Sequence, residues 1–275
     1  MPTNGTTLVR RQLGRRLKQL REAAGKTVTD VEAGRYMSAA KLWRIETGKT
    51  SVKINDARGL CFFYGADAET TDAIVALALG SSEQGWWEDY SDILPSPFHL
   101  MISLEASTTG VRSYEPELVY ALLQTPDYAR AVLRALRPDE DTETTERRVG
   151  LRLERQQAVF GRSPAVQIRA VLNEAALTRQ VGGTQCLAAQ IDHLRELDQT
   201  SHVDLYVLTW AGGAHAGMDG AFSLLDFDEP DDPTVVFLEN RVGASYLEQA
   251  PQVQAYRETW LLLLEQAIPL KEYQP

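Results

Sequence analysis

The Lys and Arg side chains of this chain gather near its start, where they could bind phosphate groups. Residues 1 to 64 hold 13 Lys and Arg against 5 Asp and Glu, a net charge of +8. The remaining residues, 65 to 275, hold 15 basic and 33 acidic side chains and sum to −18. A basic surface gains affinity for duplex DNA by releasing condensed counterions, whereas an acidic surface is repelled by the phosphates. The charge pattern therefore predicts that the first part of the chain binds double-stranded DNA and that the rest does not.

The residue types that carry out catalysis are present, but their spacing does not form a known site. The four histidines are His99, His193, His202 and His215. No two of them are four residues apart, and the sequence lacks HExxH, GxSxG and GxxxxGK motifs. The acidic run Asp226 to Asp232 has Pro230 where a calcium loop needs its third ligand, so we expect a solvated hairpin there. We predict a protein that is not an enzyme and uses no metal ion or other cofactor.

The sequence has the features of a soluble, cytoplasmic protein. Its start, MPTNGTTLVRRQ, lacks the apolar run of a secretory signal. The apolar block Trp260 to Leu264 is far shorter than the roughly 20 residues needed to cross a bilayer. Cys61 and Cys186 lie in apparently helical segments without CxxC spacing, which argues against disulfides or a zinc module. We expect two buried thiols and no membrane association.

Short helices must position the basic side chains. Leu13, Leu17 and Leu20 recur with helical spacing, and Gly25 is expected to end this first helix. Thr27 is a plausible N-cap for a short helix that runs to about Gly34.

After a break, Ser38 is a plausible cap for a second short helix, with Leu42 and Ile45 pointing inward. Two short helices with a tight break between them predict a helix-turn-helix. Thr47 to Lys49 should end the second helix, and Ser51 should begin a further one that closes an all-helical bundle.

The outer face of the second short helix is the expected reader of DNA. The first turn of such a helix enters a major groove, where small residues permit close approach and Arg or Lys can contact guanine or phosphate. Helix starts and nearby polar or basic side chains are the expected phosphate contacts. The candidate DNA-binding residues are Thr27, Ser38, Ala39, Ala40, Lys41, Arg44, Lys49, Lys53 and Arg15.

These segments resemble a known family. LGRRLKQLREAAG, MSAAKLWRIETGK and FFYG are similar to the XRE-type helix-turn-helix domain of bacterial regulators, especially the variant S-x-x-K-x-x-R-I-E-T-G. The resemblance implies a sequence-specific DNA-binding domain. The chain departs from the family pattern at Val28, Glu32 and Tyr36, where a Gln, a small residue and a turn glycine are usual. We expect the turn to use Gly34 instead.

The acidic remainder is expected to form a second domain. Asp67 to Leu79 reads as a helix, and the break GSSEQG after it predicts domains at 1–80 and 85–270. We expect helices over 115–136, broken near Thr125-Pro126, and over 143–160, 186–197 and 251–268. Runs rich in β-branched and aromatic residues predict strands over 166–172, 203–209, 221–227 and 234–238. The predicted fold is a multi-domain one, an all-α helix-turn-helix domain followed by an α+β domain with a small sheet covered by helices.

This second part also resembles a family. GWWEDY, YEPELVYALLQTPDYARAVL, LNEAALTRQVGG, VDLYVLTW and HAGMDGAFSLLDF are similar to the C-terminal domain of unknown function in WhiJ-like, antitoxin-like transcriptional regulators. The resemblance implies a regulator that is typically accompanied by a small partner protein. Tyr120-Ala121 replace the Pro-Gly that is usual before LLQT, so we expect a continuous helix there.

Three features of the second part could contact a ligand or partner. The glycine-rich loop WAGGAHAGMDGAF carries His215 and Asp219, and with Glu239 these are the candidate ligand or partner residues; a plain connection between strands is the alternative for the loop. Trp86, Trp87 and Tyr90 are expected in a core rather than in a ligand cage. Arg148, Arg152 and Arg155 form one helical stripe, expected to pair within the chain with acids such as Glu143 and Glu154.

Three functions fit these observations. The first is a sequence-specific transcriptional regulator whose acidic domain holds a homodimer together, senses a signal or binds a partner, because a single short helix reads few base pairs. The second is an antitoxin-like protein that sequesters a small partner protein encoded nearby and regulates its own gene. The third is a small-molecule-responsive repressor with a pocket near His215 and Glu239.

Overall fold

The computed structural model of the chain describes residues 4–81, 90, 92–94, 96–227, 234–241 and 243–274. It divides into two compact units, Met1–Ser107 and Thr108–Pro275. This division falls later in the chain than the break at 80–85 that the sequence predicts. Residues 82–89, with Trp86 and Trp87, lie outside the described residues, so the predicted boundary there stays a prediction.

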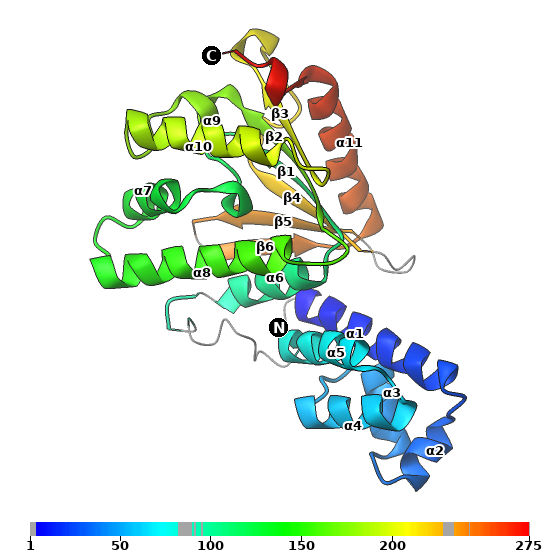
Figure 1. Cartoon of the computed structure of the whole chain (residues 1–275). Coiled ribbons are helices and arrows are strands. Elements are labelled where there is room, and N and C mark those ends of the chain that lie inside the picture. Colours follow the sequence, from blue (N-terminus) through cyan, green and yellow to red (C-terminus); the bar gives the residue numbers. More distant parts are fainter. Residues whose placement is uncertain are drawn as a thin grey trace. The chain divides into compact units, whose positions relative to one another are not determined.

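The first unit consists of helices (Figure 1). Leu13, Leu17, Leu42 and Leu60 are fully buried, so the apolar faces expected from the spacing meet in one core. The described helices are α1 (Asn4–Ala23), α2 (Val28–Ala33), α3 (Ala39–Glu46), α4 (Ile54–Tyr64), α5 (Ala68–Ser81) and α6 (Ser96–Ser107).

Two local details of the first unit differ from the sequence prediction. The helix α4 begins at Ile54, not at Ser51, because Val52 is buried and Lys53 takes the extended N-cap conformation. Gly34 has helical backbone angles as the C-cap of α2, and Arg35 instead adopts the left-handed conformation, with φ 59°. The turn therefore places Arg35, which has a Cβ atom, in a left-handed conformation that is sterically unfavourable for it and that a glycine adopts freely.

The second unit is built on a seven-stranded mixed sheet in the order β6-β5-β4-β1-β2-β3-β7. The strands β1, β2 and β3 are parallel, and the remaining neighbours are antiparallel. The strands are β1 (Gly110–Glu115), β2 (Gln167–Asn173), β3 (Val203–Leu208), β4 (Phe222–Asp226), β5 (Val235–Asn240), β6 (Gly243–Leu247) and β7 (Ile268–Pro269). The helices are α7 (Pro126–Leu136), α8 (Thr142–Phe160), α9 (Glu174–Thr178), α10 (Thr184–Leu197) and α11 (Ala250–Gln266), with 3-10 turns η2 (Ala121–Leu123), η3 (Trp210–Gly212) and η4 (Leu270–Glu272).

Helices cover both faces of this sheet, α11 on one and α7 to α10 on the other (Figure 1). The core under α11 contains Tyr114, Phe222, Val236 and Trp260. Because neighbouring residues of a strand point to opposite faces, Ser113, Glu115 and their cross-strand neighbours lie on the face of α8.

The fold class is the predicted one, a helical domain followed by an α+β domain. The predicted strands at 166–172, 203–209, 221–227 and 234–238 are confirmed as β2 to β5, and the predicted helices at 143–160, 186–197 and 251–268 as α8, α10 and α11. The strands β1, β6 and β7 were not predicted.

The predicted helix pair over 115–136 is wrong in its first half. Glu115 ends a strand, and Tyr120-Ala121 lead into the short turn η2 rather than into a continuous helix. The buried residues Val119, Leu122 and Leu123 imitate helical spacing. The backbone there bonds to distant side chains instead, since Gln156 Nε2 donates to the carbonyl oxygens of Ala121 (3.1 Å) and Gln124 (2.8 Å).

The two cysteines are free thiols, and only one is buried as expected. Cys61 is buried, whereas Cys186 is half-buried. Burial raises the pKa of both thiols. Of the described helices, none is both long and apolar enough to span a bilayer.

Candidate nucleic-acid interface

The first helix of the helix-turn-helix begins with a reciprocal cap. Thr27 Oγ1 accepts from the backbone N–H of Asp30 (3.1 Å), and an Asp30 carboxylate oxygen accepts from the Thr27 backbone N–H (2.7 Å) and hydroxyl (2.7 Å). These bonds, first that from the Thr27 backbone, lower the pKa of Asp30. The predicted N-cap is confirmed, and the Thr27 hydroxyl is already engaged in it.

The second helix, α3, has a doubly capped start. Ser38 Oγ accepts from the backbone N–H of Lys41 (3.3 Å), as predicted. Glu32, one of the departures from the family pattern, accepts from the backbone N–H of Ala39 (3.2 Å). Its carboxylate therefore ties α2 to the positive end of α3, where a negative charge is stabilising.

Arg44 and its neighbours form the exposed stripe of α3. Leu42 and Ile45 are buried, and Ala40, Trp43, Arg44 and Thr47 are exposed at i, i+3, i+4 and i+7. Within the described part of the chain, the Arg44 side chain forms no hydrogen bond or ion pair. The geometry thus leaves its guanidinium available to a base edge or a phosphate.

Trp43 adds an aromatic surface to this stripe. Its side chain is 53% exposed, and Lys49 Nζ lies 4.1 Å from the centre of its ring. A cation over an indole face is held by the ring's electrostatics. The predicted phosphate contact Lys49 is therefore positioned by Trp43, which is not among the predicted site residues.

The other candidate side chains differ in exposure and in whether they are already paired. Lys41 Nζ forms an ion pair with Asp56 Oδ2 of α4 at 2.6 Å, so its charge is used between two helices. Lys53 is exposed and caps α4, and Ala39 is half-buried at the start of α3. Arg15 is half-buried on α1.

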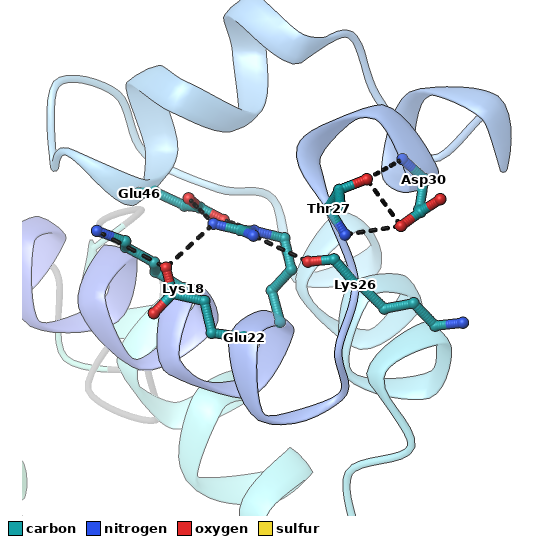
Figure 2. A network of polar contacts seen from close by, with 7 residues as sticks. Lys18, Glu22, Lys26, Thr27, Asp30 and Glu46 are labelled. Carbon is teal, nitrogen blue, oxygen red and sulfur yellow. Dashed lines mark hydrogen bonds and ion pairs between the residues drawn. The ribbon is translucent and has the colours of Figure 1, made fainter.

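A buried ion pair holds α3 against α1. Arg21 donates to both carboxylate oxygens of Glu46, Nε at 2.7 Å and Nη2 at 2.9 Å, and Nη1 donates to the Lys26 carbonyl oxygen at 2.9 Å. Figure 2 shows Glu46 reaching this network from α3 while Glu22 and Lys18 flank it on α1. The side chains of Arg21 and Glu46 are 9% and 7% accessible, so water screens this pair little.

The helices α1 and α3 also approach closely at Gly14. A Cβ at this position would lie 2.2 Å from the Ile45 carbonyl oxygen. Only glycine fits there, and with the ion pair it fixes the recognition helix on the bundle.

Tyr36, another departure from the family pattern, packs inside the unit. Its ring centre is 4.6 Å from that of Phe63, and Lys26 Nζ lies 5.1 Å from the Phe63 ring centre. The missing turn glycine is thus replaced by an aromatic contact to α4. Val28 begins α2 and is half-buried.

The candidate ligand residues of the second unit do not gather in one place. His215 packs edge-on against Tyr114, with 5.7 Å between ring centres, and its Nδ1 accepts from the Gly217 N–H (3.2 Å). Burial lowers the pKa of His215. Tyr114 belongs to the face covered by α11, whereas Glu239 lies on the opposite face, and Asp219 is exposed in the loop.

Other predicted features of the second unit have mixed outcomes. Arg148 pairs within the chain as expected, but with Glu140 (2.8 Å) rather than with Glu143 or Glu154. Asp226 pairs with Arg112 (2.8 Å), while 228–232 of the acidic run lie outside the described residues. Among the described His, Cys, Asp and Glu residues, no group of three is arranged to hold a metal ion.

Two family models match the chain, one near its start and one over its larger, later part. A helix-turn-helix domain family matches residues 12–74. The family described as domain of unknown function DUF5753 matches residues 98–272, more than half of the chain. The chain belongs to the DUF5753 family. Searches of curated proteins and of solved structures found no match to it. The helix-turn-helix domain that precedes the DUF5753 domain suggests that this chain is a DNA-binding regulator.

Proposed function

We propose that this DUF5753 protein is a sequence-specific transcription regulator of the XRE type that binds DNA as a homodimer. The observation that carries the proposal is the exposed stripe of α3, where Arg44 and Trp43 face outward within a segment, residues 1–64, that has a net charge of +8. Small Ala40 lies on the same stripe and permits the helix to approach base edges.

The fixed position of α3 on α1 supports recognition of the base sequence and not only attraction to the phosphates. The Arg21–Glu46 pair and the close contact at Gly14 fix the helix on α1. A side chain can discriminate between bases only if its position is defined, whereas a mobile basic surface binds phosphates without sequence preference.

The homodimer follows from the small size of one recognition helix. Two helices related by a twofold axis read half-sites about 10 base pairs apart and so raise the specificity. In the same proposal the second unit, which the charge pattern keeps away from DNA, holds the dimer together or receives a signal.

Selection of bound duplexes from a random library tests this function. We expect enrichment of a twofold-symmetric sequence with half-sites about one helical turn apart. Arg44→Ala should lose the preference at one position of each half-site. A library that shows no enriched sequence would contradict sequence-specific binding.

A second candidate function rests on the acidic charge of the second part, −18 over residues 65–275. Such a surface fits a small basic protein, as expected for an antitoxin-like regulator. Co-purification with a small basic protein encoded next to the gene, lost in high salt, would favour it. Separate elution of the two proteins at low salt would count against it.

A further inference from the structure

Two carboxylates lie in one row across the second unit's sheet, on the face of α8. The pairing of β1 with β4 reaches Tyr114 opposite Phe222, so the next residues in register are Glu115 and Ala221. The pairing of β4 with β5 places Ser223 opposite Phe237, and the same register brings Ala221 opposite Glu239. Glu115 and Glu239 therefore flank an exposed alanine, about 10 Å apart by the spacing of two strands.

Both carboxylates have no direct polar partner. In the described ranges, neither the Glu115 nor the Glu239 side chain forms a hydrogen bond or an ion pair. Burial, and then the charge of Glu239, raises the pKa of Glu115 to about 8. Burial also raises the pKa of Glu239. Glu115 is half-buried and Glu239 is exposed, so a bound molecule can reach both carboxylates, and a cationic group beside Glu115 would stabilise its charged form.

Arginines face this row from the helices above the sheet. Arg152 of α8 acts electrostatically on both carboxylates, and Arg155 and Arg137 act on Glu239. Arg152 Nη1 also donates to Gln124 Oε1 beside η2, and Arg148, the preceding arginine of the stripe, pairs with Glu140. Neither of these two bonds joins an arginine to Glu115 or Glu239.

The floor beside the row is small and polar. Ser113 and Ser223 are opposite each other on the same face, one step along the strands from Glu115 and Ala221. They are 0% and 3% accessible, and Ser113 Oγ is buried without a hydrogen-bond partner among the residues that the structure describes. A hydroxyl in that state is uncommon, because buried polar groups are normally bonded to protein or to something bound.

We propose that this cluster is a binding site for a small zwitterion of the amino-acid class. A ligand ammonium donates to Glu115 and Glu239 across Ala221, and its anionic group lies toward Arg152 and Arg155 on α8. A cation alone would face the arginines, and an anion alone would face the carboxylates. A molecule with both charges can pair its ammonium with the carboxylates and its anionic group with the arginines.

The site would make the second unit an amino-acid sensor. Binding at Arg152 also bears on the η2 turn, because Arg152 bonds to Gln124 directly after η2, and Gln156 of α8 bonds to the carbonyl oxygens of Ala121 and Gln124. This regulatory consequence rests on the proposed function, whereas binding itself does not require DNA.

Titration calorimetry of the full chain with each of the twenty protein amino acids, at neutral pH and without DNA, tests the site. We expect one or more of them to bind with one molecule per chain. The decarboxylated amine and the N-acetyl derivative of that amino acid should each bind about ten-fold more weakly or worse, since each lacks one charged contact. Absence of binding by all twenty, or equal binding of the single-charge analogues, would overturn the proposal.

Variants assign the binding to this cluster. Glu115→Gln and Arg155→Gln should each weaken binding about ten-fold or more. Glu117→Gln is the matched control, because Glu117 is exposed, lies two residues from Glu115 and pairs with Arg179. Glu239→Gln, at an exposed position, guards against a misfolded Glu115 variant and should show the same loss. Unchanged binding in the Glu115 and Glu239 variants would refute the assignment. Failure of DNA binding would leave these results untouched, so the two proposals fail separately.

Discussion

The Arg21–Glu46 pair offers the sharpest test of how the recognition helix is held. Glu46→Gln keeps the shape of the side chain but removes the charge that receives two arginine N–H groups. Breaking a buried ion pair from one side costs about 3 to 5 kcal/mol. Because Arg21 keeps the Lys26 carbonyl and lies 3.7 Å from Glu22, we expect the lower end, about 3 kcal/mol.

Amide hydrogen exchange in the intact chain measures this loss of stability in the first unit separately from the second. A change of about 3 kcal/mol corresponds to roughly 100-fold faster exchange of the core amides of α1 and α3. Amides of the second unit should not change. The same variant should weaken DNA binding, because the C-terminal end of α3 is no longer fixed.

Two further variants control this experiment. Lys18→Gln breaks an exposed pair with Glu22, which spans 3.9 Å, and should cost less than about 1 kcal/mol. Arg21→Met combined with Glu46→Leu should recover most of the protection, since apolar replacement of both partners is often neutral or stabilising. If Glu46→Gln accelerates exchange no more than Lys18→Gln does, the pair does not hold the helix and our reasoning is wrong.

Four other outcomes are expected. Gly14→Ala should unfold or loosen the first unit, because its Cβ would overlap the Ile45 carbonyl oxygen; a thermal unfolding midpoint equal to that of the wild type would contradict this. Arg44→Ala should cost about 1 to 3 kcal/mol on the selected duplex and little on a shuffled one, measured by fluorescence anisotropy; equal losses on both would make Arg44 a phosphate contact. Lys49→Ala should reduce the salt slope of binding by about one unit, and an unchanged slope would remove it from the interface. The free energy of unfolding of the second unit should fall as pH rises from 4.5 toward 8, by at most about 1.4 kcal/mol per pH unit, because the folded state holds the Glu115 proton more tightly than the unfolded chain does. Urea titrations of Glu115→Gln should lack this contribution. A pH dependence identical to that of the wild type would refute it.

Much of the first unit could be read from its sequence because its signals are local. Thr27 and Ser38 each cap the helix that directly follows them, and Leu42, Arg44 and Ile45 lie within about two turns of Ser38. The roles of Glu32 and Tyr36 could not be read in this way. Both act on another helix, through a cap at Ala39 and a ring contact at Phe63, and so depend on the packed structure.

The second unit shows where sequence patterns mislead. The strand β1 has a charged residue in its middle, Arg112, whose side chain pairs with Asp226, 114 residues away. The segment that follows has helical spacing of apolar residues but is held as a loop by Gln156 of α8. The carboxylate row is likewise set by strand register, so Glu115 carried no signal in the sequence.

Binding of the intact protein to DNA tests the central claim most directly. Fluorescence anisotropy would compare a duplex from upstream of its own coding region with a shuffled duplex of equal composition, over a salt titration. We predict tight binding to the first duplex, weaker binding to the second, and a steep loss of affinity with salt. Equal affinity for both duplexes, or no binding to either at low salt, would contradict a sequence-specific regulator.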